Sequence, residues 1–138
     1  MNKIAVIDGQ GGGIGSFIIK ALRDNFGENI EVIALGTNST ATAVMLKARA
    51  NKGATGENAI IWNASKVDII TGSLSIVLAN SMLGELSPAM SSAIASSKAK
   101  KILLPLNQEQ VEIINVQREP LPHLIEKLIE RIKEEIDV

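Results

Sequence analysis

A glycine-rich loop near the start of the chain constrains the fold more than any other feature of the sequence. The loop reads DGQGGGIG from Asp8 to Gly15, and five of the chain's eleven glycines lie in it. It follows the aliphatic run Ile4–Ile7 and precedes apolar residues at helical spacing, which are Ile14, Phe17, Ile18, Ala21 and Leu22. A buried strand, a glycine turn and a helix in this order are typical of the start of a parallel α/β sheet that binds a ligand at the turn.

The following segments repeat the alternation of strand and helix. Ile30–Leu35 is an aliphatic run that ends at Gly36 and predicts a second buried strand. Ala41–Ala50 predicts a second helix, because residues Thr37–Ser39 before it are all good N-cap residues. The order indicates a three-layer, Rossmann-like α/β fold with a mostly parallel sheet of about five strands and helices on both faces.

The middle of the chain allows two interpretations. Glu57–Lys66 contains β-branched residues that favour a strand, although its apolar positions also fit one side of a helix. The next predicted strand, Val67–Thr71, begins too soon afterwards for two parallel neighbours to be joined, so we favour a short helix over an antiparallel hairpin. Leu74–Met82 then has helical spacing and is stopped by Gly84.

The second half of the chain predicts two helices and two strands. Ser87 and Pro88 open a helix that runs to about residue 97. Ile102–Leu106 and Val111–Val116 predict the last two strands. Residues 121–136 carry one apolar stripe, which indicates a helix that packs on the sheet or, alternatively, a dimerisation face. Residues 1–138 are predicted to form a single domain, since one domain usually has ~100–200 residues.

The composition excludes several classes of protein. The absence of cysteine rules out disulfides, zinc–thiolate sites and thiol nucleophiles. A net charge of −1 and an aromatic content of 2% offer nucleic acid neither a phosphate footprint nor a stacking platform. No apolar stretch reaches the ~18 residues of a membrane span. Asp8 interrupts the first apolar run where a signal peptide would continue, so we expect a cytoplasmic protein.

The glycine loop predicts a phosphate site. Glycines let the backbone approach a ligand, and the free N–H groups of the first helical turn attract an anion. Ligands of open α/β sheets lie beyond the carboxyl ends of the strands, so the strand ends belong to the predicted site as well. Its residues are Asp8, Gly9, Gln10, Gly11, Gly12, Gly13, Ile14, Gly15, Gly36, Thr37, Asn38, Gly72, Ser73 and Asn107. The alternative is a tight turn that binds nothing, and no metal site is predicted.

The loop matches the dinucleotide-binding motifs only in part. Gly9, Gly13 and Gly15 fit the G-x-x-x-G-x-G spacing of short-chain dehydrogenases, whereas Ile14 takes the third glycine's place in G-x-G-x-x-G. The second strand also lacks the terminal acid that binds the ribose of NAD. A P-loop is excluded because Ser16 follows the last glycine where that motif has lysine. The ligand is unknown, and NAD(P) and a mononucleotide both stay open.

The catalytic residues are unknown. The Tyr-x-x-x-Lys pair of short-chain dehydrogenases cannot exist in a chain without tyrosine. We expect Asp8 to hold the loop through hydrogen bonds to nearby N–H groups. Glu57, Glu85 and His123 are the other candidates for an acid or a base, and opening a helix equally explains Glu57.

The chain resembles a known family of small bacterial proteins. The resemblance is carried by IAVIDGQGGGIG (4–15), ALGTN (34–38), GATGENAI (53–60), ANSMLGELSP (79–88) and KILLPLN (101–107). That family is catalogued only as a domain of unknown function with a Rossmann-like glycine loop. The resemblance implies the fold and a shared pocket, but neither a reaction nor catalytic residues.

Three functions are compatible with these features. The first is binding of a nucleotide or another small phosphorylated ligand, with the phosphate on residues 9–15 and the N-terminus of the first helix. The second is an NAD(P)-dependent or transferase-type enzyme whose cleft a partner subunit completes, which implies a homo-oligomer. The third is a non-catalytic interaction module in which the glycine loop is a structural turn.

Overall fold

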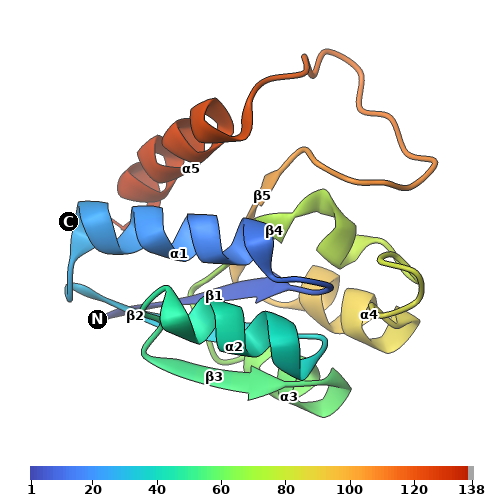
Figure 1. Cartoon of the computed structure of the whole chain (residues 1–138), viewed down its shortest axis with the longest axis horizontal. Coiled ribbons are helices and arrows are strands. Elements are labelled where there is room, and N and C mark those ends of the chain that lie inside the picture. The colour runs from blue at the N-terminus through green and yellow to red at the C-terminus, as the bar shows by residue number, and fades with distance from the viewer. Residues whose placement is uncertain (137–138) are drawn as a thin grey trace.

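The computed structural model describes residues 1–136 and contains a five-stranded parallel sheet between two layers of helices (Figure 1). The strands are β1 (Asn2–Asp8), β2 (Ile30–Gly36), β3 (Lys52–Thr55), β4 (Ile69–Ser73) and β5 (Lys100–Leu104). The helices are α1 (Gly13–Phe26), α2 (Ser39–Lys47), α3 (Glu57–Ala64), α4 (Pro88–Ser96) and α5 (Leu121–Ile136), with a 3₁₀ turn, η1 (Leu74–Val77), after β4. The predicted three-layer α/β fold is confirmed.

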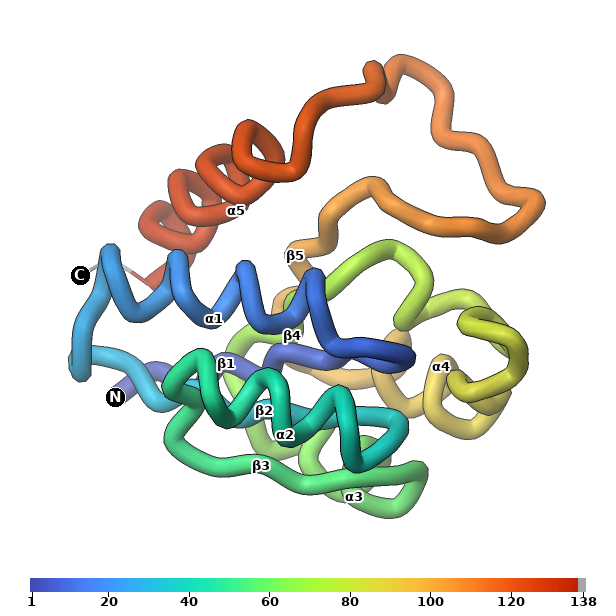
Figure 2. Tube along the Cα trace, in the orientation of Figure 1, coloured from blue at the N-terminus to red at the C-terminus, as the bar shows by residue number. Residues whose placement is uncertain are grey.

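Each face of the sheet buries its own apolar core. Helices α1, α2 and α5 cover one face, where Val6 of β1 packs with Ile18 and Leu128. Helices α3 and α4 cover the other face, where Ile7 belongs to the same core as Ile60. Successive strand residues point to opposite faces, so the continuous aliphatic run of β1 serves both cores. Figure 2 shows α5 returning beside α1, which confirms that the apolar stripe of α5 packs within the chain.

The chain crosses the sheet once, and this crossing creates a crevice. From β1 the chain runs through β2 to β3 at one edge, and then returns to place β4 on the other side of β1. Strands β1 and β4 pair in parallel, with Val6 opposite Thr71. In sheets of this strand order, the crevice beyond the carboxyl ends of the two diverging strands is where ligands bind.

The structure also decides the ambiguous segments. Glu57–Lys66 contains helix α3, as the short connection to the next strand predicted. Lys52–Thr55 forms β3, an edge strand that the sequence did not predict because KGAT has no aliphatic run. The strands predicted at Val67–Thr71 and Ile102–Leu106 are present, but with bounds displaced by two residues as β4 and β5.

Two predicted elements are wrong. Leu74–Met82 is not a helix: only the turn η1 forms, and positive φ angles at Asn80 (65°) and Met82 (58°) end any helical path. Val111–Val116 is not a strand but part of an irregular segment, residues 105–120, which we call the β5–α5 loop. Six residues separate the end of β5 from Val111, too few to bring Val111–Val116 back as a parallel neighbour. Within residues 1–136, no helix has both the length and the apolar character that crossing a membrane requires.

Candidate functional site

Asp8 holds the loop between β1 and α1. Its buried carboxylate accepts hydrogen bonds from the N–H of Gly9 at 2.8 Å and from the N–H of Gly15 at 2.7 Å. The prediction that Asp8 binds its own loop is therefore confirmed. Burial raises the pKa of Asp8, and the negative charge of Glu85 raises it further, although the two hydrogen bonds act in the opposite direction.

Three glycines of the loop are required by the fold itself. A Cβ atom on Gly9 would lie 2.5 Å from Thr37 Oγ1, and one on Gly15 would lie 2.5 Å from Met45 Sδ. Gly12 has a φ of 72°, and a Cβ there would lie 2.9 Å from the backbone of Ala41. These glycines are explained by close packing and by the left-handed conformation, without reference to a ligand.

Gly11 and Gly13 are not required by the fold. Apart from the adjoining residues of the chain and the backbone of α1 itself, no atom lies within 4 Å of the position that a Cβ would take at either residue, and neither has a positive φ. Across residues 1–136, the N–H groups of Gly11, Gly13 and Ile14 find no hydrogen-bond acceptor. The N-terminus of α1 therefore presents free N–H groups that no side chain covers, which is the arrangement that binds anions.

Glu85 closes the loop on the side of β2. Its Oε1 accepts hydrogen bonds from Thr37 Oγ1 at 2.6 Å, from the N–H of Gln10 at 2.8 Å and from Asn38 Nδ2 at 2.9 Å. These donors, with Thr37 the strongest, lower the pKa of Glu85. The side chain of Met82 lies over Gly9 on the same side.

The predicted site residues at the end of β2 are therefore occupied by contacts within the chain. Thr37 and Asn38 donate to Glu85, and Asn38 Oδ1 also accepts from the N–H of Ala41 at 2.8 Å, which caps α2. The alternative interpretation of Asn38 as an N-cap is confirmed. Gly36 packs directly against Thr42 Oγ1 and has no room for a side chain.

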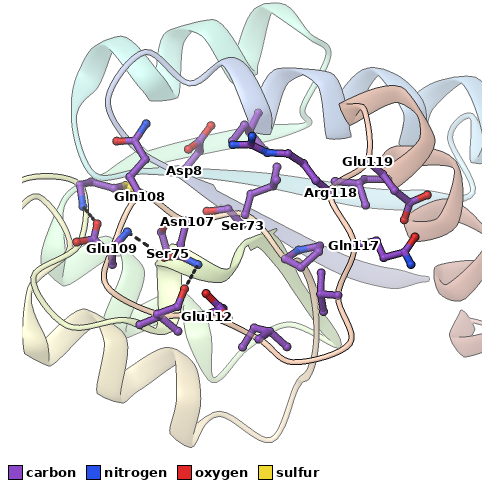
Figure 3. A pocket seen from close by; sticks show the side chains of 18 of the residues that line it. Asp8, Ser73, Ser75, Asn107, Gln108, Glu109, Glu112, Gln117, Arg118 and Glu119 are labelled. Carbon is purple, nitrogen blue, oxygen red and sulfur yellow. Dashed lines mark hydrogen bonds between the residues drawn. The ribbon is translucent and has the colours of Figure 1, made fainter.

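A cavity of about 710 Å³ opens on the other side of Asp8, at the crevice between β1 and β4 (Figure 3). Its walls are formed by Asp8, Gln10 and Ile14 of the glycine loop, by the end of β4 and η1, and by the β5–α5 loop. The glycines of the loop are not among the lining residues. Its volume lies within the ~300–1,000 Å³ of typical small-molecule sites. The polar lining residues are Asp8, Gln10, Ser73, Ser75, Asn107, Gln108, Glu109, Glu112, Gln117, Arg118 and Glu119.

Arg118 is the one basic residue in the cavity lining among the residues that the structure describes. Figure 3 shows its side chain reaching from the β5–α5 loop toward Asp8. Neither an ion pair nor a hydrogen bond joins Arg118 to another residue between positions 1 and 136. Glu119 next to it is paired with Lys127 at 2.8 Å. The sequence did not predict Arg118, because only the path of a long irregular loop brings it to the glycine loop.

The remaining predicted site residues divide between the cavity and the framework. Ser73 lines the cavity, whereas Gly72 is needed for packing because a Cβ there would lie 2.6 Å from the carbonyl oxygen of Ile7. Gly72 and Ser73 precede a four-residue 3₁₀ turn, so the helix N-terminus expected there does not exist. Asn107 lines the cavity, but its amide is hydrogen bonded to the backbone of Val111 and Glu109 within the β5–α5 loop.

Most of the candidate acids and bases lie outside the cavity. Of the four named from the sequence, only Asp8 is among the lining residues, whereas Glu57, Glu85 and His123 are not. Glu57 accepts a hydrogen bond from Ser87 Oγ at 2.5 Å. In the described part of the chain, no group of three or more histidine, aspartate and glutamate side chains is arranged to hold a metal ion.

The fold and the crevice define a Rossmann-type α/β protein with a small-molecule-sized cavity. The chain belongs to the family described as "Domain of unknown function (DUF3842)", whose model matches residues 3–137. The predicted membership of an uncharacterised family is thereby confirmed. No curated protein matches the chain.

Two solved structures are similar to this chain in fold. A dodecameric FMN-dependent UbiX-like decarboxylase from Escherichia coli O157:H7 has 12% sequence identity and a TM-score of 0.52, with 100% of this chain and 96% of that chain covered. A universal stress protein from Archaeoglobus fulgidus has 13% identity and a TM-score of 0.42, with 75% of this chain and 97% of that chain covered. The first supports the α/β fold, and neither assigns a function to this chain.

Proposed function

We propose that this protein binds a small phosphorylated ligand, with the phosphate at the N-terminus of α1 and the rest of the ligand in the cavity. The observation that carries the proposal is that the fold does not require Gly11 and Gly13. A bare backbone with unpaired N–H groups at a helix N-terminus binds phosphate through hydrogen bonds and the helix dipole. A purely structural turn would need only the other three glycines of the loop.

The charges around the loop are compatible with an anion on the side of the cavity. Asp8 and Glu85 would each repel a phosphate, but the hydrogen bonds that they accept partly neutralise their charge. Glu85 also faces β2 rather than the cavity. The free guanidinium of Arg118 is directed toward the glycine loop, where it would neutralise a bound phosphate.

The arrangement favours a ligand of mononucleotide size over NAD(P). In dinucleotide-binding sheets, a ribose lies at the end of the second strand. Here Glu85 and Met82 cover that position, so a ligand extends toward β4 and β5 instead. The decarboxylase of similar fold depends on FMN, which makes FMN a reasonable first probe.

The proposal is tested by titration of the protein with FMN, AMP, GMP and NAD by calorimetry. We expect a mononucleotide to bind and NAD to bind at least tenfold more weakly. Gly13→Val should abolish binding and leave the fold intact, because the added side chain enters the space proposed for the phosphate. Ala95→Val, on the exposed side of α4, is the matched control. Unchanged binding by Gly13→Val would refute the proposed site.

A second copy of the chain completes the cavity in this proposal. Exposed apolar side chains follow two of its lining residues in the chain: Ile114, after Ile113, is 77% exposed, and Leu83, after Met82, is 98% exposed. Exposed apolar groups beside a cavity mark interaction surfaces. We expect a homo-oligomer in light scattering after gel filtration, and a smaller species for Ile114→Ser. A monomeric wild-type protein would contradict this part of the proposal.

A further inference from the structure

Two serine residues in the cavity wall, each buried as a whole, have hydroxyl groups without a partner in the fold. Ser73 at the end of β4 is 5% exposed, and Ser75 in η1 is 6% exposed. Both line the cavity (Figure 3). Neither Oγ forms a hydrogen bond with any residue that the structure describes. Neither is among the fully buried unpaired side-chain atoms of the described residues, which are Glu31 Oε1 and Thr71 Oγ1, so both hydroxyl groups are open to the cavity. Both hydroxyl groups are therefore available to form hydrogen bonds with a ligand in the cavity.

Other buried serines are different in this respect. Ser81 Oγ donates to the carbonyl oxygen of Ser75 at 2.6 Å, and Ser91 Oγ donates to the carbonyl oxygen of Pro88 at 3.0 Å. Both hydroxyls stabilise the backbone locally. The unpaired state thus belongs to the two serines that face the cavity rather than to buried serines of this chain in general.

Asp8 stands beside Ser73 on the same face of the sheet. Val6 of β1 lies opposite Thr71 of β4, and Asp8 and Ser73 each follow two residues later. Residues two apart in a strand point to the same face, and adjacent strands are ~4.8 Å apart. An ionised carboxylate only accepts hydrogen bonds, whereas a serine hydroxyl both donates and accepts.

We propose that Asp8, Ser73 and Ser75 bind the hydroxyl groups of a sugar or polyol, so that the ligand is a sugar phosphate or a nucleotide. This inference rests on the proposed function, because the phosphate is taken to lie at the glycine loop. A ligand hydroxyl can donate to Asp8 and accept from a serine at the same time, whereas a second anionic group would be repelled by Asp8. The apolar side chains of Ile113 and Val116 on the facing loop leave space for a base or another ring beyond the sugar.

The inference is tested by comparing ribose 5-phosphate with pentyl phosphate, which has the same charge and similar length but no hydroxyl groups. Dissociation constants are measured by ligand-observed NMR. We expect ribose 5-phosphate to bind at least tenfold more tightly. Ser73→Ala and Ser75→Ala should each weaken the binding of ribose 5-phosphate by about five- to tenfold, which is the effect of one hydrogen bond. Neither substitution should change the affinity for pentyl phosphate.

The controls separate this inference from the proposed phosphate site. Ser91→Ala, on the opposite face of the sheet, should leave both affinities unchanged. Equal binding of the two compounds to the wild-type protein, both lost in Gly13→Val, would overturn the sugar subsite and leave the phosphate site standing. Binding of neither compound would overturn both. The serine variants should melt at or above the wild-type temperature, since they lose no hydrogen bond of the fold.

Discussion

Glu85 governs the electrostatics of the glycine loop. Its carboxylate takes up donors from Gln10, Thr37 and Asn38 that would otherwise face a ligand, and it places a negative charge beside the loop. Asp8 differs from Glu85, because it is buried in the cavity wall and its pKa is raised, whereas the pKa of Glu85 is lowered. Glu85 thus closes the glycine loop on the side of β2, and Asp8 borders the cavity.

Replacing Glu85 by glutamine should strengthen phosphate binding. The amide oxygen still accepts hydrogen bonds from the loop, but the negative charge is removed. We expect FMN or AMP to bind about three- to tenfold more tightly at low salt, with a smaller gain at high salt because of screening. Calorimetry at two salt concentrations measures this effect. Glu57→Gln, outside the cavity, is the control, and an equal gain in both variants would contradict the account.

Titration of Asp8 should lower the stability of the folded state as the pH rises. Because burial raises its pKa above the ordinary 3.8, the folded state binds the proton more tightly than the unfolded chain. Its contribution is therefore most favourable below pH 3.8 and is lost as the pH rises through the raised pKa. Asp8→Asn lacks this titration, so urea unfolding should show the wild type losing stability relative to the variant as the pH rises from 3.8. A gain in stability by the wild type relative to Asp8→Asn over this pH range would contradict the prediction.

At the scale of elements, the sequence predicted the strands and helices whose burial is marked by an apolar pattern in their own residues. The strands β1 and β2 and the helix α5 have continuous or periodic apolar patterns, and all three were predicted. Edge strand β3 has no such pattern, because little of it is buried. Val111–Val116 has the composition of a strand, but the short connection after β5 gives it no neighbour in the sheet. Tertiary context overrides local propensity in both cases.

Substitutions at Gly13 and Gly15 should differ in their effect on stability, because only Gly15 lies where α1 packs closely against α2. A Cβ on Gly15 would lie 2.5 Å from Met45 Sδ and 3.0 Å from Asp8 Cβ, whereas one on Gly13 meets nothing within 4 Å. We expect Gly15→Ala to destabilise the protein by about 1–3 kcal/mol through overpacking. Gly13→Ala should be neutral or stabilising by up to about 1 kcal/mol. Denaturant unfolding of both variants gives the comparison, and the reverse order would contradict the assignment of their roles.

At the scale of the whole molecule, the sequence predicted the position of the site better than its walls. The carboxyl ends of β1 and β4 were predicted from the alternation of strands and helices, and Asp8, Gln10, Ile14 and Ser73 line the cavity found there. Arg118 and Ser75 were missed, because one depends on the path of an irregular loop and the other on a segment interpreted as a helix. The role of Glu85 was missed because it requires a contact across 75 residues.

The central claim is that Gly11, Gly13 and Ile14 hold the phosphate of a small ligand. Native mass spectrometry tests it most directly, with the wild-type protein and Gly13→Val each incubated in the same extract of cellular metabolites. We predict that the wild type gains the mass of a phosphorylated compound and that Gly13→Val, folded to the same extent, does not. Identical spectra for the two proteins would contradict the claim.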